Sequence, residues 1–296
     1  MHKPCGVADN VNNSPKKTYL DQGFVLIPQV ISPHKITAMV DALQGWIEES
    51  RQHDKNYGAT VNGKARFDLE PGHSQEQPKL RRISNPVDIS QAYREVLFEG
   101  PAVAAVVDVL GPNVKFHHCK LNIKLPGMMT RVDYHQDHPF DVHTNDDHAT
   151  LLVLLDDMTE ANGCLRIVAG SHLGPQYSHY QDDEFVGKVD AHTQAMCEGT
   201  ATKLEGKAGD ICLMSSWCLH GGTPNLSQNS RRLLICDFTA ADNYPLMEPQ
   251  VPSQYTGKII AGKASRMARF RAGEIEMPYL YEADSFFGAQ GQDASS

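Results

Sequence analysis

The 296-residue sequence contains no run of 18 apolar residues, so we expect no transmembrane helix. Residues 1–17 are polar and lack the apolar centre of a secretory signal peptide. The seven cysteines include no Cys-x-x-Cys pair, and an odd, scattered set is typical of reduced thiols rather than a disulfide framework. These absences predict a cytoplasmic protein that does not associate with membranes.

The sequence also has no excess of basic residues. The chain has 27 Lys and Arg against 36 Asp and Glu, for a formal net charge of −9. This balance argues against a general nucleic-acid binder, although it leaves room for a local basic pocket that binds a small anion. The sequence has no internal repeat and contains no pattern that predicts its oligomeric state.

The hydrophobic share of 41% is enough for one large core. We predict a single domain over residues 18–284, with flexible tails at 1–17 and 285–296. Ser32-Pro33 is a helix start, because Ser caps free backbone donors and Pro fits the first helical position. Helical spacing of apolar residues predicts helices over 33–50, 89–98 and 102–110. Short apolar or alternating runs predict strands over 23–28, 114–124, 151–156, 164–168, 210–220 and 232–238. Asn162-Gly163 predicts a hairpin that joins 151–156 to 164–168.

Residues 53–77 are polar, Gly-rich and without periodicity, which is typical of a long functional or disordered loop and suggests a lid. The next segment, Lys79–Ile83, contains Arg81 and Arg82. One interpretation is a solvated strand edge. The other is that one of these arginines reaches a pocket and pairs with an anionic group of a substrate.

Two separated stretches together suggest a mononuclear iron site. Tyr134–His138 contains the pair His135-x-Asp137, whose side chains share one face if the stretch is extended. A His-x-Asp pair alone is a weak signal in a chain with 14 histidines. The later stretch Trp217–Gly222 offers His220 as a third ligand at the end of a predicted strand. Two histidines and one carboxylate hold one face of non-heme Fe(II) and leave the other positions open.

Arg231 lies 11 positions after His220, at the start of an apolar strand. An iron enzyme with a dicarboxylate cosubstrate needs a fixed cation for the remote carboxylate, and the planar fork of Arg matches it. Arg232 is adjacent and faces the other side of the strand, so we expect only one of the two to reach the pocket. The alternative for either is a surface salt bridge.

The whole pattern resembles the phytanoyl-CoA hydroxylase family of Fe(II)/2-oxoglutarate-dependent dioxygenases, over roughly residues 24–238. The resemblance rests on Tyr134–Asp137, Trp217–Gly222 and Arg231-Arg232, together with Asn162–Leu165 and Ala169–His172. It implies a mainly β fold with flanking helices, a double-stranded β-helix (jelly roll, cupin-like) whose core covers about 114–240.

By the same resemblance, His135, Asp137 and His220 match the iron ligands and Arg231 matches the arginine that holds 2-oxoglutarate. The strand Lys120–Lys124 is similar to that of the ectoine hydroxylases in this family. That similarity implies that Asn122 and Thr150 contact 2-oxoglutarate, and the alternative for Asn122 is a cross-strand hydrogen bond. His172 belongs to a Gly-Ser-His turn that we interpret as structural. Of the histidines that follow the metal motif (His138, His143 and His148), we expect one, with His138 as our candidate, to line the substrate pocket and most to face solvent.

The family's chemistry, with Fe(II), 2-oxoglutarate and O2, implies hydroxylation of an unactivated C–H bond with release of succinate and CO2. Halogenating relatives lack the carboxylate at the position of Asp137, so its presence favours hydroxylation. The substrate is expected to be a small polar, possibly anionic or phosphorus-bearing metabolite, with Arg81, Arg82 and His138 as candidate contacts. A secondary-metabolite scaffold or an acyl-CoA is the alternative. A non-catalytic jelly-roll binding protein is less favoured, because loss of activity normally removes one of His135, Asp137, His220 and Arg231, and all four are present. A zinc hydrolase is less favoured, because Arg231 would have no obvious purpose in it.

Overall fold

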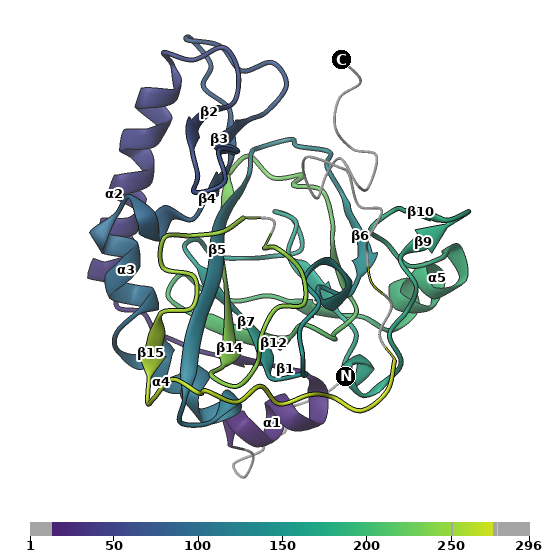
Figure 1. The fold of residues 1–296 in the computed structure, drawn as a ribbon. Helices are drawn as coiled ribbons and strands as arrows, with labels where there is room; N and C mark the ends of the chain where they lie inside the picture. Colours follow the sequence, from purple (N-terminus) through teal and green to yellow (C-terminus); the bar gives the residue numbers. More distant parts are fainter. Residues whose placement is uncertain (1–13, 250, 275–276, 278–296) are drawn as a thin grey trace, which may run out of the picture.

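The computed structural model describes residues 14–249, 251–274 and 277, and it is built around two antiparallel β-sheets (Figure 1). The large sheet has the strand order β1-β12-β7-β14-β5-β4-β3-β2, and β15 pairs with β5. Its strands are β1 (Phe24–Ile27), β2 (Tyr57–Ala59), β3 (Ala65–Leu69), β4 (Leu80–Ser84), β5 (Val114–Lys124), β7 (His148–Leu154), β12 (Ile211–Ser215), β14 (Arg231–Ala240) and β15 (Ile259–Ala261).

The small sheet has the order β11-β8-β13-β6 and packs against the large one through a shared apolar cluster. Its strands are β6 (Val132–His135), β8 (Leu165–Ile167), β11 (Thr202–Leu204) and β13 (His220–Gly222), and β9 (Tyr180–Gln181) forms a separate ribbon with β10 (Glu184–Phe185). Two facing antiparallel sheets of this kind are the jelly-roll arrangement. The predicted mainly β, double-stranded β-helix fold is therefore confirmed.

Helices pack against the outer face of the large sheet (Figure 1). They are α1 (Pro15–Gln22), α2 (Pro33–Ser50), α3 (Gln91–Leu97) and α4 (Pro101–Leu110), whereas α5 (Ala191–Thr200) lies beside β6; short 3-10 turns occupy Pro86–Asp88, His138–Phe140 and Ser171–Leu173.

Strand β7 shows why the fold has two cores. Leu151 and Val153 belong to the cluster between the large sheet and the helices, whereas Leu152 and Leu154 belong to the cluster between the two sheets. Successive strand residues point to opposite faces. A strand covered on both faces is therefore apolar throughout, which explains the continuous run in the sequence.

The helix predictions agree with α2, α3 and α4. Pro33 occupies the first turn of α2 as expected, but the Ser32 side chain makes no capping hydrogen bond. At the N-terminus, α1 already begins at Pro15 with Ser14 accepting a hydrogen bond from the Lys17 amide, so the predicted tail is wrong for residues 14–17. The predicted tail at 285–296, like residues 1–13, lies outside the described residues.

The predicted hairpin at Asn162-Gly163 is wrong. Strand β7 pairs with β12 and β14, while β8 pairs with β11 and β13 in the other sheet. Because both edges of β7 are already occupied, β8 cannot join it. The turn does form, with Gly163 at φ 79°, but it carries the chain from one sheet to the other.

Two other segments differ from expectation. Residues 53–77 are not a structureless loop, because they contain β2 and β3, which extend the large sheet beyond β4. The predicted strand 210–220 is two strands in different sheets, β12 and β13, and the chain crosses between the sheets at 216–219. This crossing places His220 opposite the other candidate ligands.

Within the described residues, no helix is both long enough and apolar enough to cross a membrane. The six described cysteines are buried and unbonded to one another, in agreement with the expected reduced thiols.

Replacement of Gly163 tests the sheet-to-sheet turn. A Cβ at this position would lie 2.5 Å from the Thr223 carbonyl oxygen, and Gly170 is the matched control because it has a similar φ of 76° with no atom within 4 Å of a Cβ. Both substitutions to Ala incur the left-handed backbone cost of about 1 kcal/mol. We expect Gly163→Ala to cost a further ~1–3 kcal/mol for the clash. Urea unfolding measures both, and equal losses would contradict the assigned close approach.

Candidate functional site

His135, Asp137 and His220 lie together between the two sheets. His220 on β13 is paired directly with His135 on β6. The Asp137 Oδ1 atom is 3.4 Å from His135 Nε2 and 3.6 Å from His220 Nε2, and one ligating atom of each residue lies within 4.8 Å of the others. The structure therefore brings together the three side chains that the sequence singled out.

The backbone at Asp137 differs from the extended stretch that we assumed. Strand β6 ends at His135, and Asp137 has helical dihedral angles (φ −73°, ψ −32°) as it begins the 3-10 turn His138–Phe140. The carboxylate nevertheless reaches both imidazoles. The side chains share a site because the chain turns after the strand, not because residues two apart alternate along it.

Both histidines are held in the tautomer that a metal requires. His135 Nδ1 lies 2.9 Å from the Asp133 carbonyl oxygen, and His220 Nδ1 lies 3.0 Å from that of Cys218. A ring that donates from Nδ1 to a carbonyl keeps a lone pair on Nε2, the arrangement that orients metal-bound histidines. The chemistry of this donor set fits a non-heme iron ion.

The charge states also suit a cation. Burial lowers the pKa of His220 to about 4, so its imidazole is neutral at physiological pH. Burial opposes ionisation of Asp137, but the neighbouring His220 and His135 hold the pKa of this carboxyl well below its ordinary value. A neutral imidazole at His220 and an ionised carboxylate at Asp137 are the forms that bind a metal cation.

An inner cavity of about 90 Å³ leads from the three candidate ligands to Arg231. Arg231 is buried, and burial lowers its pKa to about 10, so it still carries its charge at neutral pH. Its Nε and Nη1 atoms have no hydrogen-bond partner among the described residues. A buried guanidinium with open donors is costly without an anion, so the cavity suits a carboxylate.

Arg232 points to the other side of β14, where its Nε donates to Asp156 Oδ2 at 2.7 Å. Arg232 is therefore the arginine that forms a salt bridge, the alternative that we gave for either of the two. The side on which each arginine lies agrees with strand alternation, and the assignment of Arg231 to the cosubstrate remains a prediction.

Lys124 is a second cation at the far end of the inner cavity, and the sequence analysis did not select it. It is paired with Arg231 across β5 and β14, and its ammonium contacts the Thr223 carbonyl oxygen. Burial, and then the charge of Arg231, lower the pKa of Lys124 to about 7. Strand alternation was the signal for it, because Lys120, Asn122 and Lys124 share one face of β5.

Asn122 and Thr150 both line the inner cavity. The Asn122 side-chain oxygen has no hydrogen-bond partner among the described residues. Thr150 Oγ1 donates to Asp237 Oδ1 at 2.7 Å and lies 3.4 Å from Asp137 Oδ2. Thr150 thus connects a candidate iron ligand to a second carboxylate, and the predicted contact of either residue with 2-oxoglutarate stays a prediction.

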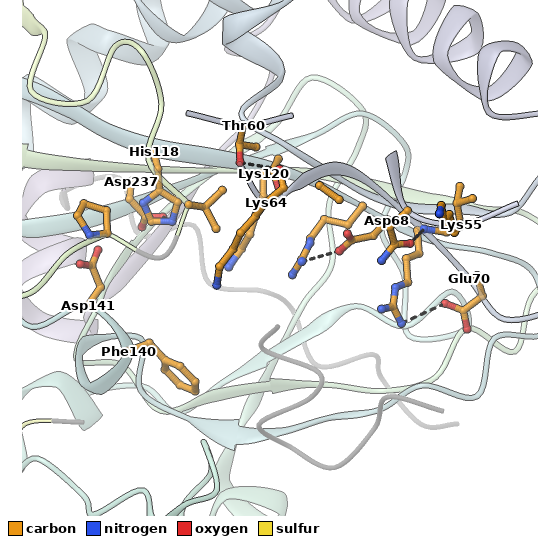
Figure 2. A pocket seen from close by; sticks show the side chains of 18 of the residues that line it. Lys55, Thr60, Lys64, Asp68, Glu70, His118, Lys120, Phe140, Asp141 and Asp237 are labelled. Carbon is orange, nitrogen blue, oxygen red and sulfur yellow. Dashed lines mark hydrogen bonds and ion pairs between the residues drawn. The ribbon is translucent and has the colours of Figure 1, made fainter. Parts of the chain in front are cut away.

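A larger outer cavity of about 830 Å³ lies between the β2–β4 extension of the sheet and the turn that follows Asp137 (Figure 2). Lys64, Lys120 and Asp68 lie on one side of it, and Phe140 and Asp141 lie on the other. Its full set of lining residues includes Arg81 and Arg82, which form ion pairs with Glu70 and Asp68 respectively. Arg82, Lys120 and Asp137 line both cavities and mark the junction between them.

The remaining histidines differ from expectation. His138 is buried against Trp217, with ring centroids 4.1 Å apart, and is not among the residues that line these two cavities. His143 and His148 are also buried, so the expectation that most of these histidines face solvent is wrong. His172 lies 3.1 Å from the Leu20 carbonyl oxygen, a contact that ties the turn to α1.

Comparison with known proteins agrees with this geometry. The family model described as phytanoyl-CoA dioxygenase (PhyH) matches residues 19–233. A probable alpha-ketoglutarate-dependent hypophosphite dioxygenase of Stutzerimonas stutzeri is 27% identical over 268 residues, which cover 89% of this chain and 91% of the relative. A 2-aminoethylphosphonate dioxygenase of an uncultured bacterium is 24% identical and covers 75% of this chain and 79% of its own.

Among solved structures, EctD from S. alaskensis with bound Fe has a TM-score of 0.66 at 18% identity, covering 89% of this chain and 90% of EctD. This likeness confirms the jelly-roll fold. The family model extends from α1 into β14 and includes all three candidate metal ligands and Arg231. The chain therefore belongs to the phytanoyl-CoA dioxygenase family and is a 2-oxoglutarate-dependent dioxygenase that uses iron and O2.

Proposed function

We propose that this dioxygenase hydroxylates an unactivated C–H bond of a small anionic metabolite, with a phosphonate-like compound as the favoured class. His135, Asp137 and His220 would hold the iron, and Arg231 and Lys124 would hold the remote carboxylate of 2-oxoglutarate. Iron with 2-oxoglutarate and O2 supplies the oxidising power, and succinate and CO2 are released. The role of the chain is to place the substrate bond beside the metal and to exclude competing reactions.

The observation that carries the proposal is the shape of the inner cavity. Its two ends offer the two things that 2-oxoglutarate needs: a metal-ligand set at one end and a buried cation with open donors at the other. A zinc hydrolase would have no use for buried Arg231. A binding protein without catalysis would have no need for three metal-ligating side chains gathered at one point.

The substrate class rests on the junction between the cavities. Arg82 and Lys120 lie there beside Asp137, so an anionic group bound to them would stand next to the metal. An anion in this position is attracted by charge-assisted hydrogen bonds. Two relatives that match most of the chain are named for small phosphorus compounds, hypophosphite and 2-aminoethylphosphonate, which supports the same class.

The size of the outer cavity favours a second candidate, the same chemistry on a larger scaffold such as a secondary metabolite or an acyl-CoA. A volume of about 830 Å³ lies within the range of cavities that hold drug-sized ligands. A small substrate would require the segment 53–77, which contributes much of the cavity wall, to close over it. The two candidates differ in which compounds stimulate turnover.

The test is substrate-dependent succinate formation by anaerobically iron-loaded protein given 2-oxoglutarate, O2 and pools of small phosphonates, polar amino acids, acyl-CoA thioesters or larger natural products. We expect a phosphonate pool to stimulate succinate release and one component to gain the mass of one oxygen. His135→Ala is the negative control and should form no succinate. Stimulation by the larger compounds alone would replace the first candidate with the second.

Arg231→Ala tests the cosubstrate assignment, with Arg232→Ala as its matched control on the same strand. Loss of two charge-assisted hydrogen bonds, worth about 3 kcal/mol together, predicts a ~100-fold higher Kd for 2-oxoglutarate. Arg232→Ala leaves the cavity intact, and we expect its Kd to stay within about threefold of the parent. Anaerobic titration of the iron-loaded protein measures both, and the opposite ranking would show that Arg232 holds the cosubstrate.

Lys124 makes 2-oxoglutarate binding depend on pH. Its pKa is lowered to about 7, so the ammonium is charged below this pH and attracts a carboxylate, and that attraction is lost as the pH rises through 7. We expect Kd for 2-oxoglutarate to increase about 3- to 10-fold between pH 6 and pH 8.5, because loss of one charged partner is worth about 1 kcal/mol. Lys124→Met should bind weakly at all pH values. A pH profile of the same slope in this variant would exclude Lys124 as the titrating group.

Arg82→Gln tests the substrate contact. Arg82 lines both cavities, whereas Arg81 lines the outer cavity but not the inner one, so Arg81→Gln is the neighbouring control. We expect Arg82→Gln to raise the substrate KM by about tenfold, the equivalent of one charged hydrogen bond, while substrate-independent decay of 2-oxoglutarate is unchanged. Equal, small effects of both substitutions would assign the arginines to the ion pairs with Asp68 and Glu70 alone.

A further inference from the structure

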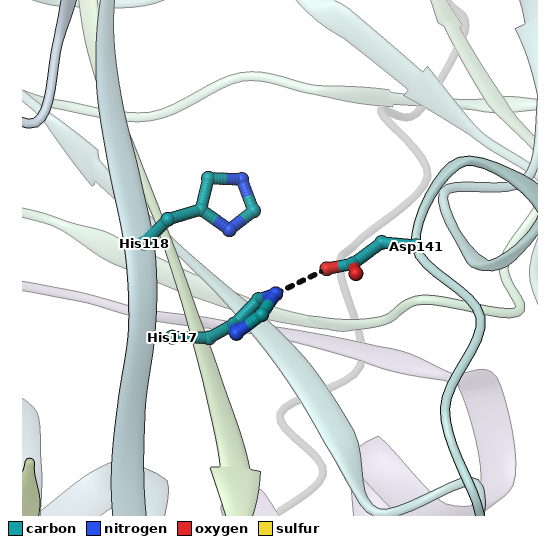
Figure 3. A group of neighbouring side chains, drawn as sticks. All are labelled: His117, His118 and Asp141. Atoms are coloured by element: carbon teal, nitrogen blue, oxygen red, sulfur yellow. Dashed lines mark ion pairs between the residues drawn. The ribbon is translucent and has the colours of Figure 1, made fainter. Parts of the chain in front are cut away.

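A cluster of buried histidines and carboxylates lies beside the iron site and has no part in the chemistry above. Asp141, His143 and His148 each offer a ligating atom within 4.8 Å of the others, and the same is true of His117, His118 and Asp141. The histidine rings pack edge to face, with centroids of His143 and His148 4.7 Å apart and those of His117 and His143 4.9 Å apart. Figure 3 shows His117 and His118 on β5 facing Asp141 from the turn opposite.

Buried polar atoms in this cluster lack partners. His143 and His148 are 1% and 2% exposed, and Oδ1 of Asp141, Nε2 of His143 and Nδ1 of His148 make no hydrogen bond to the described residues. Buried groups of this kind are normally hydrogen-bonded, and leaving them open costs about 1–3 kcal/mol each. The side chains face one another instead, and a cation between them would satisfy them together.

His143 is held in the same way as the candidate iron ligands. Its Nδ1 lies 2.7 Å from the carbonyl oxygen of Asp141, two residues earlier. His135 and His220 contact the carbonyls of Asp133 and Cys218 at the same spacing. This contact leaves the lone pair on Nε2. His179 shows the alternative use of that geometry, because its Nε2 accepts a backbone hydrogen bond from Gln136, whereas Nε2 of His143 has no such partner.

His148 and Asp141 have supporting contacts of the kind that surround metal ligands. His148 Nε2 lies 3.4 Å from Asp237 Oδ1, which favours a proton on Nε2 and leaves Nδ1 as an acceptor. His117 Nε2 lies 2.6 Å from Asp141 Oδ2, which engages one oxygen of that carboxylate and leaves Oδ1. Carboxylates beside ligating histidines, and partners beside ligating carboxylates, fix ligand orientation in metal sites.

Protonation differs among His148, His143 and Asp141. Burial opposes a charge on His148, but the hydrogen bond and charge of Asp237 raise its pKa, so a metal ion competes with a proton at this ring. Burial lowers the pKa of His143 to about 3, so the ring is neutral at physiological pH. Burial opposes ionisation of Asp141, but the neighbouring His117 and His143 keep its pKa well below the ordinary value. Neutral imidazole and ionised carboxylate are the forms that bind a metal.

We propose that Asp141, His143 and His148 bind a second divalent metal ion of the zinc type, separate from the iron. Two imidazoles and one carboxylate are a known three-residue set for Zn²⁺, which takes a fourth ligand from water or another molecule. His117 positions Asp141, and Asp237 positions His148. His118 is left out of the set, because it comes within ligating distance of His117 and Asp141 but does not belong to the group that contains His143 and His148.

The site is coupled to the iron site by a short chain of contacts. Asp237 accepts a hydrogen bond from Thr150, and Thr150 Oγ1 lies 3.4 Å from Asp137. Asp141 and His148 also line the outer cavity. The second ion therefore borders the space in which the substrate is proposed to bind, although its existence does not depend on the identity of that substrate.

The experiment counts metal in protein stripped with a chelator, reloaded with Zn²⁺ and passed through gel filtration. We expect two equivalents in the parent chain, one in His135→Ala/His220→Ala, one in His143→Ala/His148→Ala and none in the fourfold variant. His118→Ala is the control within the cluster and exposed His192→Ala is the control on the surface, and both should retain two. Circular dichroism establishes that each variant is folded.

A second readout avoids dependence on any one variant. In His135→Ala/His220→Ala, Zn²⁺ should raise the melting temperature by binding the folded state, and the more conservative His143→Gln should abolish this rise. Two equivalents of Zn²⁺ in His143→Ala/His148→Ala would overturn the proposal. So would a single equivalent in the parent that is still bound by His143→Ala/His148→Ala. Loss of an equivalent in His118→Ala but not in the His143 variants would overturn the assigned ligand set.

Discussion

The pairing of His220 with His135 across β13 and β6 is the contact on which the rest of the site depends. It brings together residues 85 positions apart, and it requires the chain to leave the large sheet after β12 and cross to the small one. Asp137 can complete the set because the strand ends at His135 and the backbone turns at once. The metal-ligand set is therefore a product of the jelly-roll topology and not of any local motif.

The neighbouring strands β5 and β14 of the large sheet line the two cavities that extend from the candidate metal ligands. The face of β5 that carries His118, Lys120, Asn122 and Lys124 leads from the outer cavity to the end of the inner one. The paired face of β14 runs in the opposite direction, from Arg231 at the inner end to Asp237 at the outer end. Antiparallel pairing thus places cations at the cosubstrate end and the Asp237 carboxylate near the histidine cluster.

A β-bulge in β5 brings additional histidines close to the candidate iron site. The β5–β14 register pairs His118 with Asp237 and then Phe116 with Phe238, so His117 is an extra residue in β5. Bulges redirect side chains, and here two consecutive residues come within reach of Asp141. The cluster of histidines and carboxylates around that bulge is connected to the iron site by contacts from His148 to Asp237, from Asp237 to Thr150 and from Thr150 to Asp137.

The sequence alone determined the helices α2 to α4 and the long strands β5 and β14, because these depend on local periodicity. It indicated the fold and the three candidate iron ligands through residue types that resemble a known family, whereas the meeting of these three side chains at one site was decided by the topology. The sequence also placed Arg231 and Arg232 on opposite sides of a strand, which alternation requires. Tertiary structure decided which sheet each strand joins, which is why the Asn162-Gly163 turn links two sheets and not two neighbours. It also decided that His138, His143 and His148 are buried, since burial follows from what packs over a loop, and no local pattern encodes that.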